Sequence, residues 1–286
     1  MTNRSDYRFF ERLRVRWSEI DAQKIVFNGH YLTYFDTAMA GYWRALAMPY
    51  AETMAQLEGD LFVRKATVEY LASARYDDLL DIGLRSARVG NSSIVFHAAA
   101  YRQGRLLVTG ELVYVFADPL TQKPRPVPQT LRDVLAAFEA GKSMVKVRLG
   151  SWAELQEPAA QIRRQVFVEE QQIPVELEWD DADAGNLHAV AFNRFGLPLA
   201  TGRLVDYAPG VARIGRMAVS QTLRGSGIGQ RVLDALLQSA KERGDLQVVL
   251  HAQTSAEAFY RRAGFVQNGP SFDEAGIAHV EMTKAL

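Results

Sequence analysis

The chain of 286 residues contains no cysteine. Without a thiol there can be no cysteine nucleophile, no cysteine-based zinc site and no disulfide framework, and the absence fits a reducing compartment. An excess of either charge is missing too, because Lys and Arg number 33 and Asp and Glu also number 33. A neutral chain is not expected to have nucleic acid or an anionic membrane as its main partner.

Long apolar runs are also missing, since none approaches the roughly 18 residues of a membrane-spanning helix. The charged N-terminus, residues 1–17, lacks the apolar core of a secretory signal. We therefore expect a cytoplasmic protein with no membrane partner. Hydrophobic residues make up 48% of the chain, enough to bury a core in each of two domains of about 150 residues.

The clearest domain boundary in the sequence lies near residue 143. Four prolines within residues 118–128 exclude regular structure there. Apolar spacing predicts a helix over 130–140, which Gly141-Lys142-Ser143 ends, and an alternating strand starts afresh at Met144. The sequence therefore predicts two domains, residues 1–143 and residues 144–286.

The first half predicts a strand, one long helix and then only strands. Apolar residues recur at helical spacing from Tyr31 through Tyr34, Phe35, Ala38, Tyr42 and Leu46. Strand-like runs follow at residues 61–71, 79–89, 92–103 and 106–116, with hairpin turns at Gly90-Asn91 and Gln103-Gly104. One helix against an antiparallel sheet is an α+β fold.

The second half alternates strands and helices, which is an α/β order. The predicted elements are strand 145–149, helix 154–168, strands near 187–193, 198–206 and 211–219, helix 227–243, strand 246–251, helix 254–263 and strands after Gly264.

A glycine loop, Arg224-Gly225-Ser226-Gly227-Ile228-Gly229, separates a predicted strand from a predicted helix. Glycines let the backbone approach a ligand closely, and the first N–H groups of a helix carry about half a positive charge. The arrangement predicts a phosphate or pyrophosphate site. The alternative is a tight turn that uses glycine only for its φ angles. A Walker A loop is excluded because Gln230 and Arg231 follow, and a dinucleotide fingerprint would need a small residue at Val232.

The spacing Arg-x-x-Gly-x-Gly resembles the acyl-CoA pyrophosphate loop of the GNAT N-acyltransferases. Downstream, Phe259-Tyr260-Arg261-Arg262-Ala263-Gly264-Phe265 matches the Phe-Tyr-x-x-x-Gly-Phe helix end of that family. The resemblance covers residues 144–286 and implies a GNAT fold, with a small-molecule or peptide amine as acyl acceptor. It also implies that coenzyme A binds at the loop (Arg224, Gly225, Ser226, Gly227, Ile228, Gly229) and at the preceding strand (Met217, Ala218, Val219).

Tyr260 is the predicted catalytic residue of this half. Acyl transfer to an amine expels CoA as a thiolate, and a nearby phenol can protonate it. The resemblance implies this role. The alternative is a core tyrosine packed beside Phe259 and Phe265.

An acidic run that includes Glu178 and Asp180 follows a stretch, residues 163–171, that resembles the acceptor side of a GNAT subgroup. The resemblance implies that these carboxylates attract or deprotonate the cationic amine. The alternative is a solvated acidic loop. The run lacks the spacing of a calcium loop, and we predict no metal site. His251, beside the expected cleft, is a further catalytic candidate.

Asp21 is the candidate of the first half, in the loop before the long helix and beside Asn28 and His30. A carboxylate there can attack an activated carbonyl or deprotonate water for that attack. Backbone N–H groups at the helix start can hold the oxyanion. The alternative is that Asp21 and Asn28 are turn and capping residues.

The same loop resembles hotdog-fold acyl-CoA thioesterases of the 4-hydroxybenzoyl-CoA type over residues 8–141. Their pattern aromatic-x-x-x-Asp-x-x-Gly-Val-Val-aromatic-x-x-x-Tyr is matched by Trp17, Asp21, Ile25, Val26, Phe27 and Tyr31. The resemblance implies that Asp21 is the catalytic carboxylate and that the chain is a homodimer or homotetramer through this half. Lys24 departs from the usual glycine, His30 from asparagine and Asn28 from histidine.

Together the two resemblances imply a bifunctional acyl-CoA enzyme without a metal. Its hotdog half would pass the acyl group to water, and its GNAT half would pass it to an amine. The alternative is that one half has lost its chemistry and only binds acyl-CoA or joins subunits. The departures at Lys24 and His30 indicate that, in this alternative, the hotdog half is the one without catalytic activity.

Overall fold

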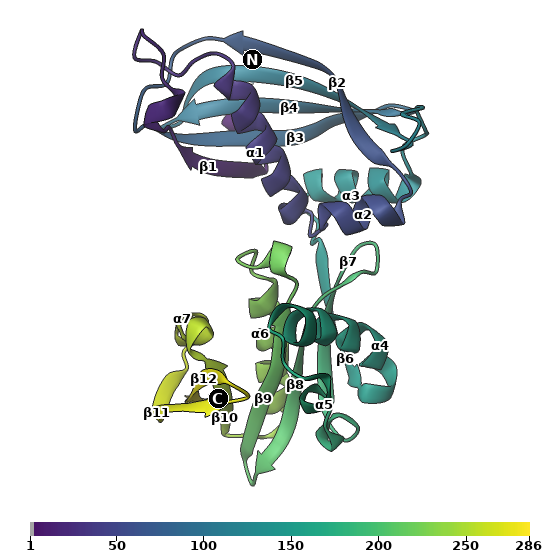
Figure 1. The fold of residues 1–286 in the computed structure, drawn as a ribbon, viewed down its shortest axis with the longest axis vertical. Helices are drawn as coiled ribbons and strands as arrows, with labels where there is room; N and C mark the ends of the chain where they lie inside the picture. Colours follow the sequence, from purple (N-terminus) through teal and green to yellow (C-terminus); the bar gives the residue numbers. More distant parts are fainter. Residues whose placement is uncertain (1–2) are drawn as a thin grey trace. The chain divides into compact units, whose positions relative to one another are not determined.

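The computed structural model describes residues 3–286. This part of the chain forms two compact units, the first ending at Met144 and the second beginning at Val145. Each unit has its own sheet and its own buried core (Figure 1).

Within residues 3–144, five strands form one antiparallel sheet in the order β1-β3-β4-β5-β2. The predicted hairpins join β3 to β4 and β4 to β5, and Gln103 and Gly104 both have positive φ, at 49° and 81°. The strands are β1 (Phe9–Arg14), β2 (Asp60–Tyr70), β3 (Leu79–Val89), β4 (Ser93–Arg102) and β5 (Arg105–Ala117).

The predicted long helix is α1 (His30–Ala45), which lies across one face of this sheet (Figure 1). Its apolar stripe is buried, and Tyr42 is 0% exposed with its ring edge-on to Phe96 and Phe138. Two further helices complete the unit: α2 (Tyr50–Gln56), which the sequence did not predict, and α3 (Gln129–Glu139).

Within residues 145–286, seven strands form a mixed sheet in the order β11-β12-β10-β9-β8-β7-β6. In this described part, β9 and β10 run parallel and the other neighbouring strands run antiparallel. The strands are β6 (Val145–Ser151), β7 (Leu187–Asn193), β8 (Pro198–Ala208), β9 (Val211–Val219), β10 (Gln247–Gln253), β11 (Val266–Glu274) and β12 (Ile277–Ala285).

Helices α4 (Trp152–Arg163) and α6 (Ile228–Arg243) cover opposite faces of this sheet. Val190 of β7 packs against α4, whereas Gly202 of β8, on the other face, lies against Val232 and Leu236 of α6. Side chains alternate between faces along a strand, which separates the two sets. The remaining helices are α5 (Val175–Glu178) and α7 (Glu257–Arg262).

The predicted helix 154–168 has two parts. A Ser151–Glu154 capping box starts α4 at Trp152, and after Arg163 the backbone continues as the π-helix η3 (Arg164–Glu170). π-Helical turns are rare and are often found at functional sites. Here the π-helix leads directly into the cavities described below.

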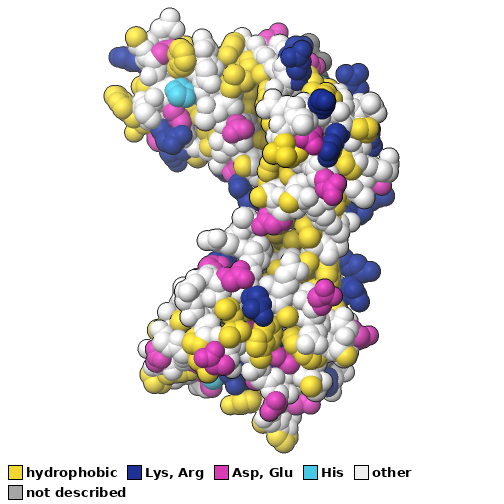
Figure 2. Space-filling model, turned by 45° about the vertical axis from the view of Figure 1, so that its right-hand side comes forward, with side chains coloured by type: hydrophobic (Ala, Val, Ile, Leu, Met, Phe, Trp, Pro, Cys, Tyr) yellow, Lys and Arg dark blue, Asp and Glu magenta, His cyan; other side chains and the backbone are white. Residues whose placement is uncertain are grey.

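Acidic and basic side chains are interspersed on the surface in both units, on the face that Figure 2 shows. This distribution agrees with the balance of charge in the sequence. Within residues 3–286, no helix is both long enough and apolar enough to cross a membrane.

Candidate functional site

Strands β9 and β10 part after a short parallel contact. Their pairing runs from Val211 with Gln247 to Arg213 with Val249, and no further pairing of the two strands is found in the described chain. Beyond this point β9 also bulges against β8, where Arg216 has a φ of 53°. A bulge next to an open strand edge bends the strand and marks many active sites. The parting opens a cleft in the sheet.

A cavity of about 680 Å³ lies in this cleft. It contains most of the residues that the sequence predicted for coenzyme A: Met217, Ala218, Val219, Arg224, Gly225, Gly227 and Gly229. Ser226 and Ile228 do not line it: the Ser226 hydroxyl donates to the Leu223 carbonyl at 2.5 Å, and the Ile228 side chain is buried in the core. Tyr260 also lines this cavity.

The glycine loop needs glycine for its backbone angles. Gly225 and Gly227 have φ of 80° and 82°, in the left-handed region that glycine adopts most easily. A Cβ atom at either position would meet nothing within 4 Å, so the space beside the loop is open. The helix α6 begins at Ile228, directly after Gly227. The φ angles and the open space at the helix start are compatible with both sequence interpretations, and a phosphate site at this loop stays a prediction.

Arg224 is held by a carboxylate from the π-helix. Its Nη1 and Nη2 donate to Oε1 and Oε2 of Glu170, both at 2.6 Å, and its Nε donates to the Val219 carbonyl at 3.2 Å. The hydrogen bonds and charge of Arg224 hold the pKa of Glu170 below its usual range. Glu170 lines the same cavity as the glycine loop.

Tyr260 stands between two cavities. It lines the cavity of about 680 Å³ and also a second one of about 410 Å³. Its ring packs against Phe259 and Phe265, and burial raises the pKa of its phenol well above the ordinary value. Within the described chain its hydroxyl makes no hydrogen bond, and the phenol remains protonated over the neutral range.

The second cavity has a polar wall. His251 Nδ1 lies 2.9 Å from Arg213 Nη2 and 3.0 Å from Glu274 Oε2, and all three residues line the cavity. Burial alone would raise the pKa of Glu274, but the hydrogen bond and charge of His251 outweigh it and lower that pKa. Glu178 lines the same cavity, whereas Asp180 does not.

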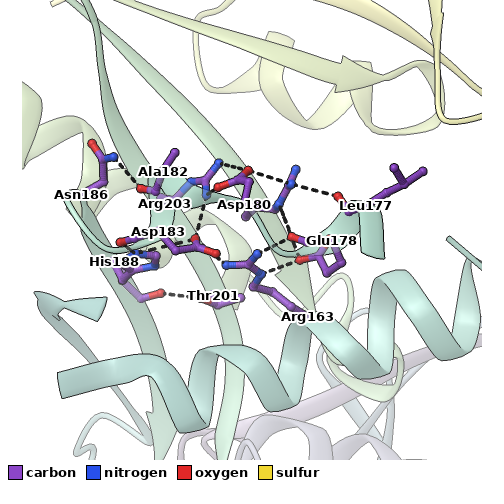
Figure 3. Close-up of polar contacts among 12 residues, drawn as sticks. Arg163, Leu177, Glu178, Asp180, Ala182, Asp183, Asn186, His188, Thr201 and Arg203 are labelled. Atoms are coloured by element: carbon purple, nitrogen blue, oxygen red, sulfur yellow. Dashed lines mark hydrogen bonds and ion pairs between the residues drawn. The ribbon is translucent and has the colours of Figure 1, made fainter. Parts of the chain in front are cut away.

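Glu178 and Asp180 both belong to an ionic network (Figure 3), in which Glu178 is buried and Asp180 is exposed. Arg163, only 1% exposed, donates to Glu178 at 2.5 Å and to Asp183 at 2.8 Å. Arg203 donates to Asp183 at 2.7 Å and to Asp180 at 2.5 Å. A third arginine, Arg216, bonds Asp180 at 3.0 Å and lies 3.6 Å from Glu178.

Burial and charge pairing shift the pKa values of this network in opposite directions. Burial raises the pKa of Glu178, although Arg163 opposes the shift. Burial also acts to raise the pKa values of Asp180 and Asp183, but the hydrogen bonds and charges of Arg203 and Arg163 outweigh it and lower both. Three guanidinium groups thus face three carboxyl groups, and the network holds the segment after α5 against the sheet.

Asp21 of the first unit stabilises its own turn. Its Oδ1 accepts the backbone N–H of Gln23 at 2.8 Å and that of Ile25 at 3.5 Å. Lys24, where the sequence resemblance implies glycine, has a left-handed φ of 60°. The turn lies between the short helix Trp17–Glu19 and α1, where the sequence expected it.

The other two predicted residues of this loop lie at the start of α1. The carbonyl of Asn28 accepts the Tyr70 hydroxyl at 3.1 Å, and the ring of His30, the first helical residue, meets the Phe27 ring edge-on. The N–H groups of His30 and Tyr31 donate to the carbonyls of Phe27 and Asn28 at 3.0 and 3.4 Å. Roles for Asp21, Asn28 and His30 in catalysis stay predictions.

Comparisons with known proteins assign each unit separately. Residues 167–286 match the acetyltransferase (GNAT) domain family, and residues 23–109 match the thioesterase superfamily. The uncharacterized N-acetyltransferase YjcF of Bacillus subtilis (strain 168) is 33% identical over 43% of this chain and 87% of its own length. The acyl-CoA thioester hydrolase YbgC of Escherichia coli O6:H1 is 32% identical over 42% of this chain and 89% of its own length.

The chain joins a thioesterase-superfamily domain to a GNAT acetyltransferase domain. The predicted order, hotdog first and GNAT second, is confirmed. A crystal structure of an acyl-CoA N-acyltransferase from Pseudomonas aeruginosa, 33% identical, matches 49% of this chain and 99% of that one with a TM-score of 0.45. Both families use acyl-CoA substrates. Among residues 3–286 no group of three His, Asp or Glu side chains could hold a metal ion.

The sequence reasoning missed three features of the GNAT domain. Glu170, which holds Arg224, and Gln253, which pairs with Gln171, were not singled out. Arg203 and Arg216, which neutralise the acidic run, were also not singled out. Glu170 and Gln171 lie within the 163–171 stretch that resembles a GNAT subgroup. The sequence around them does not show that they pair with Arg224 and Gln253.

Proposed function

We propose that the chain is a bifunctional acyl-CoA enzyme. Its GNAT domain transfers an acyl group from CoA to an amine, and its thioesterase domain hydrolyses an acyl-CoA thioester. The observation that carries the first activity is the cavity of about 680 Å³, which joins the open glycine loop to the buried phenol of Tyr260. A helix N-terminus can bind the phosphates of an acyl carrier, and a buried phenol can protonate the leaving thiolate. A site with both suits transfer of an acyl group from CoA.

The N–H groups at the start of α6 and the side chain of Arg224 would hold the pyrophosphate of CoA. The free edge of β9 at Met217, Ala218 and Val219 would accept the pantetheine amides. The thioester then reaches Tyr260, where the two cavities adjoin.

The amine enters from the cavity of about 410 Å³ and attacks the thioester carbonyl carbon. A C–N bond forms, the C–S bond breaks, and the phenol proton of Tyr260 passes to the departing sulfur. The nitrogen loses one proton, to water or to a basic side chain of this cavity, and the phenol regains one from solvent. Of the two predicted acceptor residues, Glu178 faces this cavity, and Asp180 bonds the nearby Arg216.

In the thioesterase domain, Asp21 would act as nucleophile or as base for a water molecule. The thioester then yields a carboxylate and free CoA. Support comes from its position in the loop before α1 and from a relative named as an acyl-CoA thioester hydrolase. Asn28 and His30 would contact the substrate from the same loop.

A second candidate role for the thioesterase domain is binding or subunit assembly without turnover. The observation that favours it is the turn at Asp21, whose carboxylate is already bonded to the backbone of Gln23.

We also propose a homodimer or homotetramer through the thioesterase domain. Strand β2 is eleven residues long, and it lies at an edge of the sheet. Its central residues 63–67 are exposed. Long exposed edge strands usually pair with another chain or are blocked.

A panel of acyl-CoA thioesters, assayed with and without primary amines, tests both activities. Free thiol released without amine reports hydrolysis, and an N-acyl product detected by mass spectrometry reports transfer. Absence of amide with every amine, despite CoA binding, would remove the transferase assignment.

A further inference from the structure

The two cavities of the GNAT domain adjoin at a small group of side chains. Among the described residues, five line both cavities, and we name them the neck: Gln171, Met217, Gln253, Ala256 and Tyr260. They come from different elements, which are the end of the π-helix η3, β9, β10, the turn after β10, and α7. Residues that line both spaces mark the place where the contents of one cavity meet the contents of the other.

Two amides close one side of the neck. Gln253 Nε2 donates to Gln171 Oε1 at 2.9 Å, and Gln171 Nε2 donates back to Gln253 Oε1 at 3.5 Å. The partners are 82 positions apart in the sequence, and both are partly buried. Reciprocal bonding holds both side chains across the gap between the π-helix and β10.

The fold explains why side chains close this gap. Pairing of β9 with β10 ends at Arg213 and Val249, and Gln253 is the last residue of β10. No backbone ladder of these two strands reaches the neck. The width of the neck therefore depends on how far the two glutamine side chains extend.

The acyl group lies in the neck if transfer proceeds as proposed. Tyr260, the proton donor to the sulfur, is a neck residue, and the amine comes from the cavity of about 410 Å³ on the other side. The carbonyl carbon must meet both, so the acyl chain has only the space that Met217 and the amide pair leave.

We propose that the Gln171–Gln253 amide pair sets the acyl length of the GNAT domain and restricts it to short acyl groups. This inference rests on the proposed transferase function. A long acyl chain has to separate the two amides, which leaves partly buried polar groups without their partners. It also has to enter the acceptor cavity, where it competes with the amine.

The test compares the full chain with the double variant Gln171→Ala/Gln253→Ala and with the shortened amide Gln253→Asn. Gln238→Ala, an exposed glutamine on α6, is the matched control. Each protein receives acetyl-CoA or octanoyl-CoA with lysine methyl ester, spermidine and tyramine as acceptors. The N-acyl product is measured by mass spectrometry, so hydrolysis by the thioesterase domain does not contribute.

The kcat/KM for octanoyl-CoA relative to acetyl-CoA should rise at least about tenfold in the double variant and less in Gln253→Asn, as expected for an enlarged apolar pocket. Gln238→Ala should keep the wild-type ratio. A ratio within about twofold of wild type in a double variant that still transfers acetyl groups overturns the proposal.

Binding gives an answer that needs no amine. The thioethers S-ethyl-CoA and S-octyl-CoA are titrated into the same proteins by calorimetry. Titrations of Gly227→Glu, which places an anion in the glycine loop, give the contribution of the thioesterase domain. The wild-type GNAT domain should prefer the ethyl thioether, and the double variant should lose that preference. An unchanged preference contradicts the proposed restriction, whereas wild-type protein that forms no amide but binds selectively contradicts only the transferase function.

Discussion

Glu170 accepts two hydrogen bonds of 2.6 Å from Arg224, the arginine that begins the glycine loop. The carboxylate is thus bound where the proposed function places a pyrophosphate. Under the proposed function, coenzyme A and Glu170 would compete for the same guanidinium group, because both would use its two parallel N–H donors. The pair is partly exposed, with side chains 42% and 32% accessible, so solvent weakens it and a ligand can displace it.

Glu170→Gln should therefore strengthen CoA binding. Loss of one competing surface ion pair of about 0.2–1 kcal/mol predicts binding about 1.4- to fivefold tighter, with a difference that shrinks at high salt. Calorimetric titration of CoA into the full chain measures this, and the thioesterase domain contributes equally to wild type and variant. Glu169→Gln, an exposed neighbour, is the control. Weaker binding in Glu170→Gln would mean that Glu170 holds Arg224 in place for CoA.

Tyr260→Phe keeps the buried ring and removes only the hydroxyl. Amide formation should fall by roughly 10²–10⁴ if the phenol protonates the thiolate. Because burial raises the phenol pKa above its ordinary 10.0, wild-type transfer should lose no activity through phenol ionisation as the pH approaches 10.0. Tyr207→Phe, at a tyrosine that is 53% exposed, should retain full activity. Normal amide formation by Tyr260→Phe would show that Tyr260 is a core residue and not the proton donor.

The substitution Asp21→Asn tests the catalytic role of the Asp21 carboxylate while it keeps the hydrogen bond that stabilises the turn. The amide oxygen of asparagine can still accept the N–H of Gln23, so the turn should survive. Amine-independent thiol release should fall by at least about a hundredfold, as for a lost general base, while amide formation continues. Asp36→Asn, on the exposed side of α1, is the control. Hydrolysis that persists in Asp21→Asn and disappears in Tyr260→Phe would move the thioesterase activity into the GNAT domain.

Local patterns were enough to predict both folds. The spacing from Tyr31 to Leu46 shows the buried face of α1, and the turns at Gly90-Asn91 and Gln103-Gly104 order three strands. The glycine loop could be recognised for the same reason, since the predicted phosphate site is made of consecutive residues. Helix α2 was missed because its seven residues are too few to show a periodic apolar face.

The pairings across the site could not be predicted in this way. Glu170 and Arg224 are 54 positions apart, and Gln171 and Gln253 are 82 apart. An acidic run such as residues 176–183 has the same composition whether it is solvated or buried. Only the ion pairs that Arg163 and Arg203 make from two other elements show that this run belongs to an ionic network. At Lys24 the sequence showed a departure from the glycine that the family resemblance implies, and the structure gives this residue the left-handed φ that glycine adopts most easily.

Arg163→Gln should destabilise the GNAT domain strongly. Arg163 is 1% exposed and bonds both Glu178 and Asp183, so its loss removes one positive charge and its hydrogen bonds from two buried carboxyl groups. Breaking a buried ion pair on one side costs about 3–5 kcal/mol. Urea unfolding of the full chain measures the change. The adjacent Arg164→Gln is exposed and should stay within about 0.5 kcal/mol of wild type, and equal effects of the two variants would contradict the buried network.

The thioesterase domain should be the part that joins subunits. Its edge strand β2 exposes residues 63–67 and has an unpaired side within the described chain, whereas the proposed GNAT site lies within one chain. Division of the chain after Ser143 should give an N-terminal piece that is a dimer or tetramer by light scattering. The C-terminal piece should have a lower molar mass than the N-terminal assembly in the same measurement. Hotdog relatives, as the sequence resemblance implies, build each site across the subunit seam, so dilution to monomers should abolish hydrolysis. A monomeric N-terminal piece that still hydrolyses acyl-CoA would contradict both the assembly and the shared site.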